Sequence, residues 1–160
     1  MTPRRRAALA AALLTLAGST AACSATVSAS QVFRGTAGDV VVLADPPAVP
    51  ALRCTIGRYA VEQPRGVRLG TATPEAIAAA VKDGEPADLV ILPAGAALDR
   101  VRDELATPPA RIAMAPAGAT QWVAAVTDKG LGLARFLAGH QARSLLSSSH
   151  CTATANGQTG

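Results

Sequence analysis

The chain has 160 residues, about the length of one domain, and only 2% are aromatic, so its core must be built from Val, Leu, Ile and Ala. The formal net charge of +4 includes Arg4, Arg5 and Arg6, which fall in a segment that we expect to be removed on export. Without these three of the 15 basic residues, 12 remain against 11 acidic ones, and they are scattered along the sequence. This composition argues against nucleic acid as a partner.

Residues 1–22 are predicted to be a lipoprotein signal peptide, with three arginines, a short apolar run and then small residues. The apolar run is too short to remain as a membrane-spanning helix. Residues 19–23 resemble a bacterial lipobox, which implies that Cys23 is lipidated and anchors the protein to the outer face of the cell membrane. Ordinary cleavage near Ala22, with Cys23 unmodified, is the alternative, and the sequence does not decide between the Sec and twin-arginine routes.

After the signal peptide, residues 23–38 are rich in Ser, Thr, Ala and Gly, and we expect them to form a flexible tether. Residues 39–151 then alternate apolar runs with segments of helical spacing, and residues 152–160 are expected to be a disordered tail. Thr73 is predicted to cap a helix in which Pro74 occupies the first position and Gly84 marks the stop. In chain order, the expected elements are a strand at 40–43, a helix at 48–61, a strand at 67–69, a helix at 73–83, a strand at 89–92, a helix at 94–105, strands at 111–114 and 121–126, and a helix at 130–146.

The strand at 89–92 consists of four consecutive apolar residues, so it needs cover on both faces. Together with the strand–helix alternation, this predicts an α/β fold: a single-lobed three-layer sandwich with a mostly parallel sheet. In such sheets, ligands bind beyond the carboxyl ends of the strands. The acidic turn that leads into this strand, with Asp83, Glu85 and Asp88, is expected to be a solvated loop.

Three cysteines are an odd number for an exported protein. With Cys23 assigned to lipid, Cys54 and Cys151 form an even pair, and an oxidising compartment favours a disulfide between them. The alternative is a metal site made by Cys54, His150 and Cys151, but it lacks a fourth ligand. We expect no metal ion and no cofactor, and we expect His140 to be packed within a helix.

Residues 73–100, TPEAIAAAVKDGEPADLVILPAGAALDR, resemble the extracytoplasmic substrate-binding proteins of molybdate-type ABC importers. Residues 131–146, LGLARFLAGHQARSLL, are similar to the closing helices of that family. The resemblance implies one lobe of a type 2 periplasmic binding fold, a small solute as ligand and an importer permease as partner. The chain is about half the length that the family implies. We favour the first lobe, although residues 44–60 also resemble the turn that opens the second.

The matching ligand site would lie around Asp45, Thr71, Thr73 and Pro93. The family holds an oxyanion with hydroxyls and backbone N–H groups, whereas here Asp45 and Glu75 bring negative charge and Pro46, Pro47 and Pro74 have no N–H to donate. We therefore expect reduced or altered ligand binding, with a neutral or cationic ligand. Thr73 has a structural role as a cap beside any role in binding.

No nucleophile elbow, phosphate-binding loop, zinc-protease motif or catalytic pair of carboxylates occurs in the sequence, so we expect a protein that is not an enzyme. The expected function is that of a membrane-anchored solute-binding lipoprotein. The alternative is a lipoprotein that uses the same α/β scaffold for protein–protein contact at the cell surface.

Overall fold

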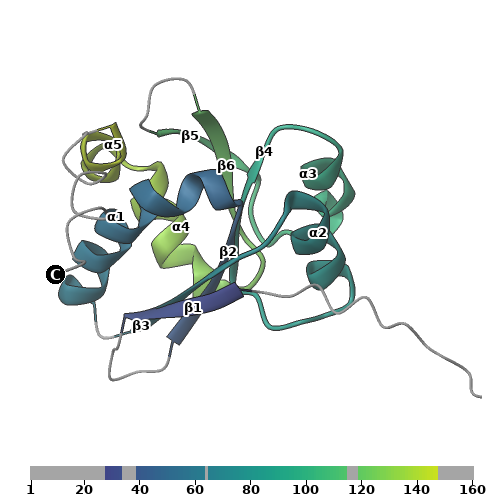
Figure 1. Cartoon of the computed structure of the whole chain (residues 1–160), viewed down its shortest axis with the longest axis horizontal. Coiled ribbons are helices and arrows are strands. Elements are labelled where there is room, and N and C mark those ends of the chain that lie inside the picture. The colour runs from purple at the N-terminus through teal and green to yellow at the C-terminus, as the bar shows by residue number, and fades with distance from the viewer. Residues whose placement is uncertain (1–27, 34–38, 64, 115–118, 148–160) are drawn as a thin grey trace, which may run out of the picture.

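The structure is a computed structural model that describes residues 28–33, 39–63, 65–114 and 119–147. Figure 1 shows a central sheet with helices on two sides. The strands are β1 (Ser28–Phe33), β2 (Asp39–Ala44), β3 (Gly66–Thr71), β4 (Leu89–Pro93), β5 (Ala110–Met114) and β6 (Ala119–Ala125). The helices are α1 (Val49–Glu62), α2 (Pro74–Lys82), α3 (Ala96–Arg100), α4 (Leu131–Ala138) and α5 (His140–Ser147), with short 3-10 turns η1 (Pro46–Ala48), η2 (Arg102–Glu104) and η3 (Asp128–Gly130).

The six strands lie in the order β1-β3-β2-β4-β6-β5. Only the central strands β3, β2 and β4 run parallel, whereas β1, β6 and β5 pair antiparallel with their neighbours. The prediction of a mostly parallel sheet is therefore right for the centre and wrong for both sides. The link between β5 and β6 is too short for the crossover that parallel neighbours need, so these two strands form an antiparallel pair.

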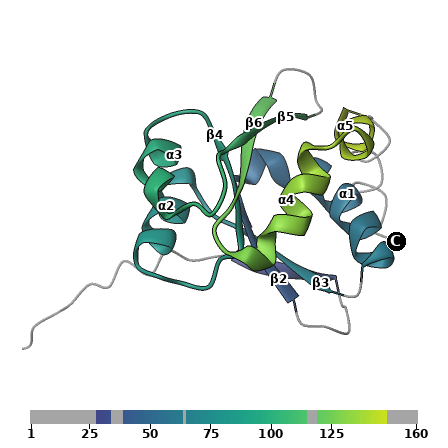
Figure 2. The same cartoon turned by 180° about the vertical axis from the view of Figure 1, so that it is seen from behind.

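The strand β4 is covered on both faces, as its sequence predicted. Leu89 and Ile91 pack in one apolar cluster with residues of α1, α4 and α5, and Val90 and Leu92 pack in a second cluster with α2 and α3. Figures 1 and 2 show these two groups of helices on opposite sides of the sheet. Each of these four side chains is completely buried, which stabilises the fold by about 1.5–3 kcal/mol per residue. The three-layer α/β arrangement is thus present.

Two of the expected helices are shorter than predicted. The helix expected at 94–105 ends at Arg100 and continues as the turn η2, because Val101 leaves helical geometry with φ −102° and ψ 3°. The helix expected at 130–146 is split in two at Gly139, whose ψ of 171° is extended. Glycine is a poor helix former, so a break at this position costs little. His140 begins α5 and is exposed, so the prediction that it is packed was wrong.

The predicted tether is also partly wrong, because residues 28–33 form β1. This strand pairs antiparallel with β3, with Phe33 opposite Val67. The pairing satisfies backbone groups of β3 that would otherwise lie at an open sheet edge. The signal peptide at 1–22, Cys23, His150, Cys151 and the tail at 152–160 lie outside the described residues. Within the described part, no helix has the length and apolar character needed to cross a membrane.

Candidate functional site

Asp45 lies at the carboxyl end of β2, at the edge where ligands bind in open α/β sheets. Its backbone N–H donates to the carbonyl oxygen of Ile91 at 3.1 Å, which fixes it beside β4. The residue is only 8% exposed. Its carboxylate accepts a hydrogen bond of 3.3 Å from the side-chain amide of Gln121 on β6. Pro93 at the end of β4 pairs with Gln121 across the sheet, so these three residues meet at one edge.

The electrostatic environment opposes the charge on Asp45. Burial is the main cause that raises the pKa of its carboxyl group, the hydrogen bond from Gln121 acts in the opposite direction, and the negative charge of Glu75 raises the pKa further. A site with two carboxylates that repel each other offers little to an anion. The geometry therefore agrees with the charge argument made from the sequence.

Two buried polar atoms at this end of the sheet have no hydrogen-bond partner. They are the amide oxygen Oε1 of Gln121 and the hydroxyl oxygen of Thr71. Thr71 pairs with Ala44, the residue before Asp45, but β2 and β4 separate its strand from that of Gln121. Gln121 was not predicted from the sequence, although a glutamine next to the apolar run Trp122–Ala125 is a usable signal. An unsatisfied buried acceptor costs free energy unless a donor reaches it.

Thr73 has a structural role. Its side chain accepts a hydrogen bond of 3.3 Å from the backbone N–H of Ala76, which caps α2 as the sequence predicted. The residue is exposed, and it is not brought into contact with Gln121. In the structure, Asp45, Pro93 and Gln121 therefore lie together and Thr71 lies near them. Thr73 lies apart from them, at the exposed start of α2.

Five cavities on the described surface are lined by residues other than Asp45, Thr71, Thr73 and Pro93. One of about 270 Å³ begins directly after Pro93. Its lining includes the indole of Trp122, whose buried N–H has no hydrogen-bond partner. An ion pair of 2.8 Å between Arg102 and Asp99 lies at its lining. Space for a small molecule thus lies next to the predicted site and not within it.

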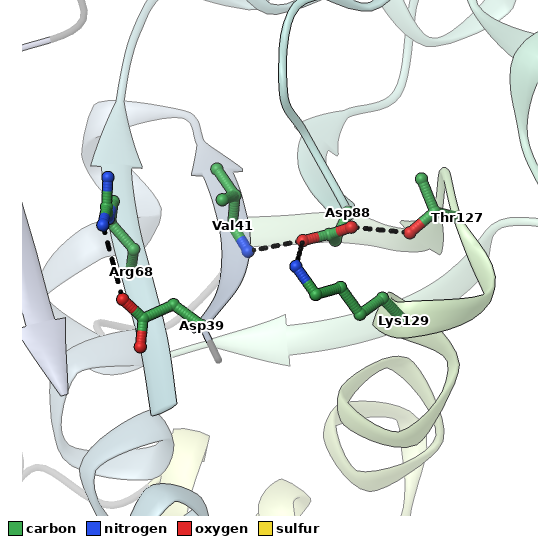
Figure 3. A network of polar contacts seen from close by, with 6 residues as sticks. All are labelled: Asp39, Val41, Arg68, Asp88, Thr127 and Lys129. Atoms are coloured by element: carbon green, nitrogen blue, oxygen red, sulfur yellow. Dashed lines mark hydrogen bonds and ion pairs between the residues drawn. The ribbon is translucent and has the colours of Figure 1, made fainter. Parts of the chain in front are cut away.

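The prediction that Asp88 lies in a solvated loop is wrong, because its side chain is only 8% exposed. Figure 3 shows its carboxylate holding three partners: it accepts from the backbone N–H of Val41 at 2.9 Å, from the Thr127 hydroxyl at 2.6 Å and from the Lys129 ammonium group at 3.4 Å. These partners lie in β2 and in the segment after β6. Asp88 therefore ties three separate parts of the chain together at the amino end of β4, opposite the candidate site. Asp83 and Glu85 are exposed, as expected.

Cys54 is exposed on α1 and is disulfide-bonded. Its partner is not among the described residues, so the pairing with Cys151 stays a prediction. The described residues contain no group of three or more His, Cys, Asp or Glu side chains that could hold a metal ion.

We expect peptide mapping without reduction to recover a peptide pair that links Cys54 to Cys151. The sequence has three cysteines. If Cys23 carries lipid, Cys151 is the one cysteine that remains to pair with Cys54. Mapping after reduction and alkylation serves as the control. A peptide pair that links Cys54 to Cys23 would contradict both the pairing and the lipid anchor.

Asp45→Asn should change how stability depends on pH. Because the pKa of Asp45 is raised in the folded chain, the folded state holds this proton more tightly than the unfolded state. The resulting stabilisation is complete below the ordinary value of 3.8 and is lost as the pH rises through the raised value. Asn does not ionise, so the variant does not lose stability as the pH rises. Its free energy of unfolding should therefore exceed that of the wild type at pH 7, and the difference should disappear near pH 3.

Urea unfolding of both proteins at pH 3, 5 and 7 measures the effect. Asp83→Asn removes a carboxylate at an exposed position and controls for the change in net charge. Equal differences between Asp45→Asn and the wild type at all three pH values would contradict the prediction.

No protein-family model, no curated protein and no solved structure matches the chain in the three comparisons made.

Proposed function

We propose that the chain is a membrane-anchored extracytoplasmic solute-binding lipoprotein whose ligand is neutral or cationic and not an oxyanion. The observation that carries this proposal is the buried Asp45 carboxylate at the carboxyl end of β2, held by Gln121. The resemblance of residues 73–100 to importer binding proteins supports the general role. An importer permease is the partner that this role requires.

The choice of ligand class rests on charge and on hydrogen bonding. An oxyanion at this edge would face the charges of Asp45 and Glu75, which already repel each other. The buried, unpaired acceptor on Gln121 would favour a ligand with an N–H or O–H donor once this edge opens to admit it. The neighbouring cavity of about 270 Å³ is slightly smaller than the usual range for ligand pockets, which begins at about 300 Å³. A small ligand with donor groups fits these conditions.

A thermal-shift screen of the mature protein, followed by isothermal titration, tests the ligand class. A ligand that binds the native state raises its melting temperature. We expect a shift with at least one neutral or cationic solute, such as a sugar, an amino acid or a polyamine, and we expect that molybdate, tungstate and sulfate do not compete with that solute. Asp45→Ser should gain affinity for oxyanions. Submicromolar binding of an oxyanion that competes with this solute would overturn the proposed ligand class.

The proposed anchor is tested separately. Cys23→Ala should move the protein from the membrane fraction into a soluble extracytoplasmic fraction, because it removes the residue that would carry lipid. Cys54→Ala serves as the control, since it removes a cysteine without touching the lipobox. A wild-type protein that is already soluble, with a free thiol at Cys23, would contradict the anchor.

One observation favours a role in protein–protein contact as a second candidate. The unpaired atoms of Gln121 and Thr71 are buried, so a ligand could reach them only if this edge opened. A scaffold that works through its surface needs no such opening. In vivo crosslinking from the exposed residue Thr73 distinguishes the two roles: solute binding predicts that crosslinks go to a permease, and the contact role predicts another surface protein.

A further inference from the structure

A cavity of about 390 Å³ lies at the opposite end of the sheet from Asp45, between the end of α1 and the start of α4. It is lined by Tyr59, Gln63, Arg65, Asp128, Lys129 and Gly132. Arg65 directly precedes β3, which places the cavity at the amino ends of the parallel strands. Figure 2 shows α4 and α1 on the same side of the sheet.

The residue Tyr59 brings a hydroxyl group to the lining of this cavity, and a ligand could bind to it. Tyr59 is only 9% exposed, and its ring packs against Phe136 with 5.1 Å between ring centroids. Within the described part of the chain, its hydroxyl makes no hydrogen bond. A Cβ on Gly132 would lie 3.1 Å from this hydroxyl, so glycine leaves room for it on the cavity wall. A hydroxyl on a cavity wall is a donor that a ligand can use.

Positive charge gathers on this side of the molecule. Residues 49–65 and 127–147, which build the α1, α4 and α5 layer, contain six Lys or Arg and only two Asp or Glu. Residues 73–109, which include α2 and α3, contain three Lys or Arg and seven Asp or Glu. Without Arg4, Arg5 and Arg6, the sequence holds 12 basic residues that look scattered, but six of them lie in this one layer.

Two of these cations line the cavity. Arg65 lies close enough to Tyr59 for its charge to oppose, in part, the rise in the tyrosine pKa caused by burial. Lys129 contacts Asp88 at 3.4 Å, and its side chain stays 41% exposed. Asp128 is the one acidic residue in the lining, so the cations outnumber it by two to one.

We propose that this cavity binds a phosphate-type oxyanion, with the Tyr59 hydroxyl and the Arg65 guanidinium donating hydrogen bonds and Lys129 adding positive charge. Arginine suits this role because its planar fork of N–H groups matches an oxyanion. The phosphate group could belong to a small soluble molecule or to the headgroup of an anionic lipid. The site lies at the opposite end of the sheet from Asp45 and does not depend on the function proposed above.

Isothermal titration of the purified full chain with inorganic phosphate tests the site directly. Arg65→Gln and Tyr59→Phe should each weaken binding roughly tenfold, the effect expected for loss of one hydrogen bond to a charged group. Tyr59→Phe keeps the ring that packs on Phe136, so circular dichroism should show an unchanged fold. Arg53→Gln removes an equal charge at an exposed position of α1 that does not line the cavity, and it should bind like the wild type.

Flotation with vesicles distinguishes the two sources of phosphate. Binding to phosphatidylglycerol vesicles and not to phosphatidylcholine vesicles, lost in Tyr59→Phe and Arg65→Gln, assigns the site to a lipid headgroup. Binding of free phosphate without vesicle binding assigns it to a small molecule. The proposal is overturned if neither probe binds, or if Arg53→Gln weakens binding as much as Arg65→Gln does, since diffuse surface charge would then explain the result.

Discussion

Asp88→Ala is expected to lower the free energy of unfolding by about 3 kcal/mol. The substitution removes the acceptor of three hydrogen bonds and leaves the backbone N–H of Val41 without its partner inside the sheet. It also weakens the attachment of the segment after β6, because Thr127 and Lys129 lose the carboxylate that they contact and only the backbone bonds to the Asp88 carbonyl remain. Urea unfolding followed by circular dichroism measures the change, and the melting temperature should fall by roughly 10 °C.

Asp83→Ala is the matched control for this experiment. Asp83 belongs to the same acidic turn but is exposed. Its replacement should therefore change the free energy of unfolding by less than about 0.5 kcal/mol. Equal effects of the two substitutions would show that the turn, and not the buried carboxylate, determines stability here.

Gly130→Ala should be similarly damaging, for a steric reason. A Cβ at this position would lie 2.0 Å from the backbone carbonyl oxygen of Asp88. That oxygen already accepts hydrogen bonds from the backbone N–H groups of Val126 and Thr127, so it cannot move without breaking them. We expect a loss of about 3 kcal/mol in the free energy of unfolding. Thermal unfolding of the variant beside the wild type provides the measurement.

Gly132→Ala provides the comparison two residues away. Its Cβ would meet only the Tyr59 hydroxyl, at 3.1 Å, which is the end of a side chain and not backbone. Alanine also favours the helix α4 more than glycine does. The variant should therefore be close to the wild type in stability. If Gly130→Ala unfolds at the same temperature as Gly132→Ala, the close approach to Asp88 does not constrain the fold.

The layers of the fold could be predicted because they depend on local sequence patterns. Four apolar residues at 89–92 predicted a strand with both faces buried, and helices do cover both of its faces. The cap at Thr73 followed from residue chemistry within one helical turn. The split at Gly139 and the strand at 28–33 were missed. Neither has a strong local signal, because β1 depends on a partner strand far along the chain and glycine also occurs inside helices.

The candidate site was predictable only in part. Asp45 could be placed because it directly follows an apolar strand, and parallel strands end at a common edge. Gln121 could not be placed, since its contact with Asp45 joins residues 76 positions apart and depends on the antiparallel register of β6. Asp88 was misjudged for the same reason. Its partners Val41 and Thr127 come from other strands, and composition made its turn look like solvent-exposed chain.

The strand β1 would limit how far a lipid on Cys23 allows the domain to stand from the membrane. A free tether over residues 23–38 could extend about 50 Å, but the chain from Cys23 to Ser28, where β1 begins, spans at most about 17 Å. A lipid on Cys23 would hold the edge of the sheet within that short distance of the bilayer surface. The domain would then meet its partners by lateral diffusion within a thin layer above the bilayer. Its effective concentration would be high for membrane proteins whose docking surfaces lie close to the bilayer. A partner whose docking face projects far above the bilayer would be out of its reach.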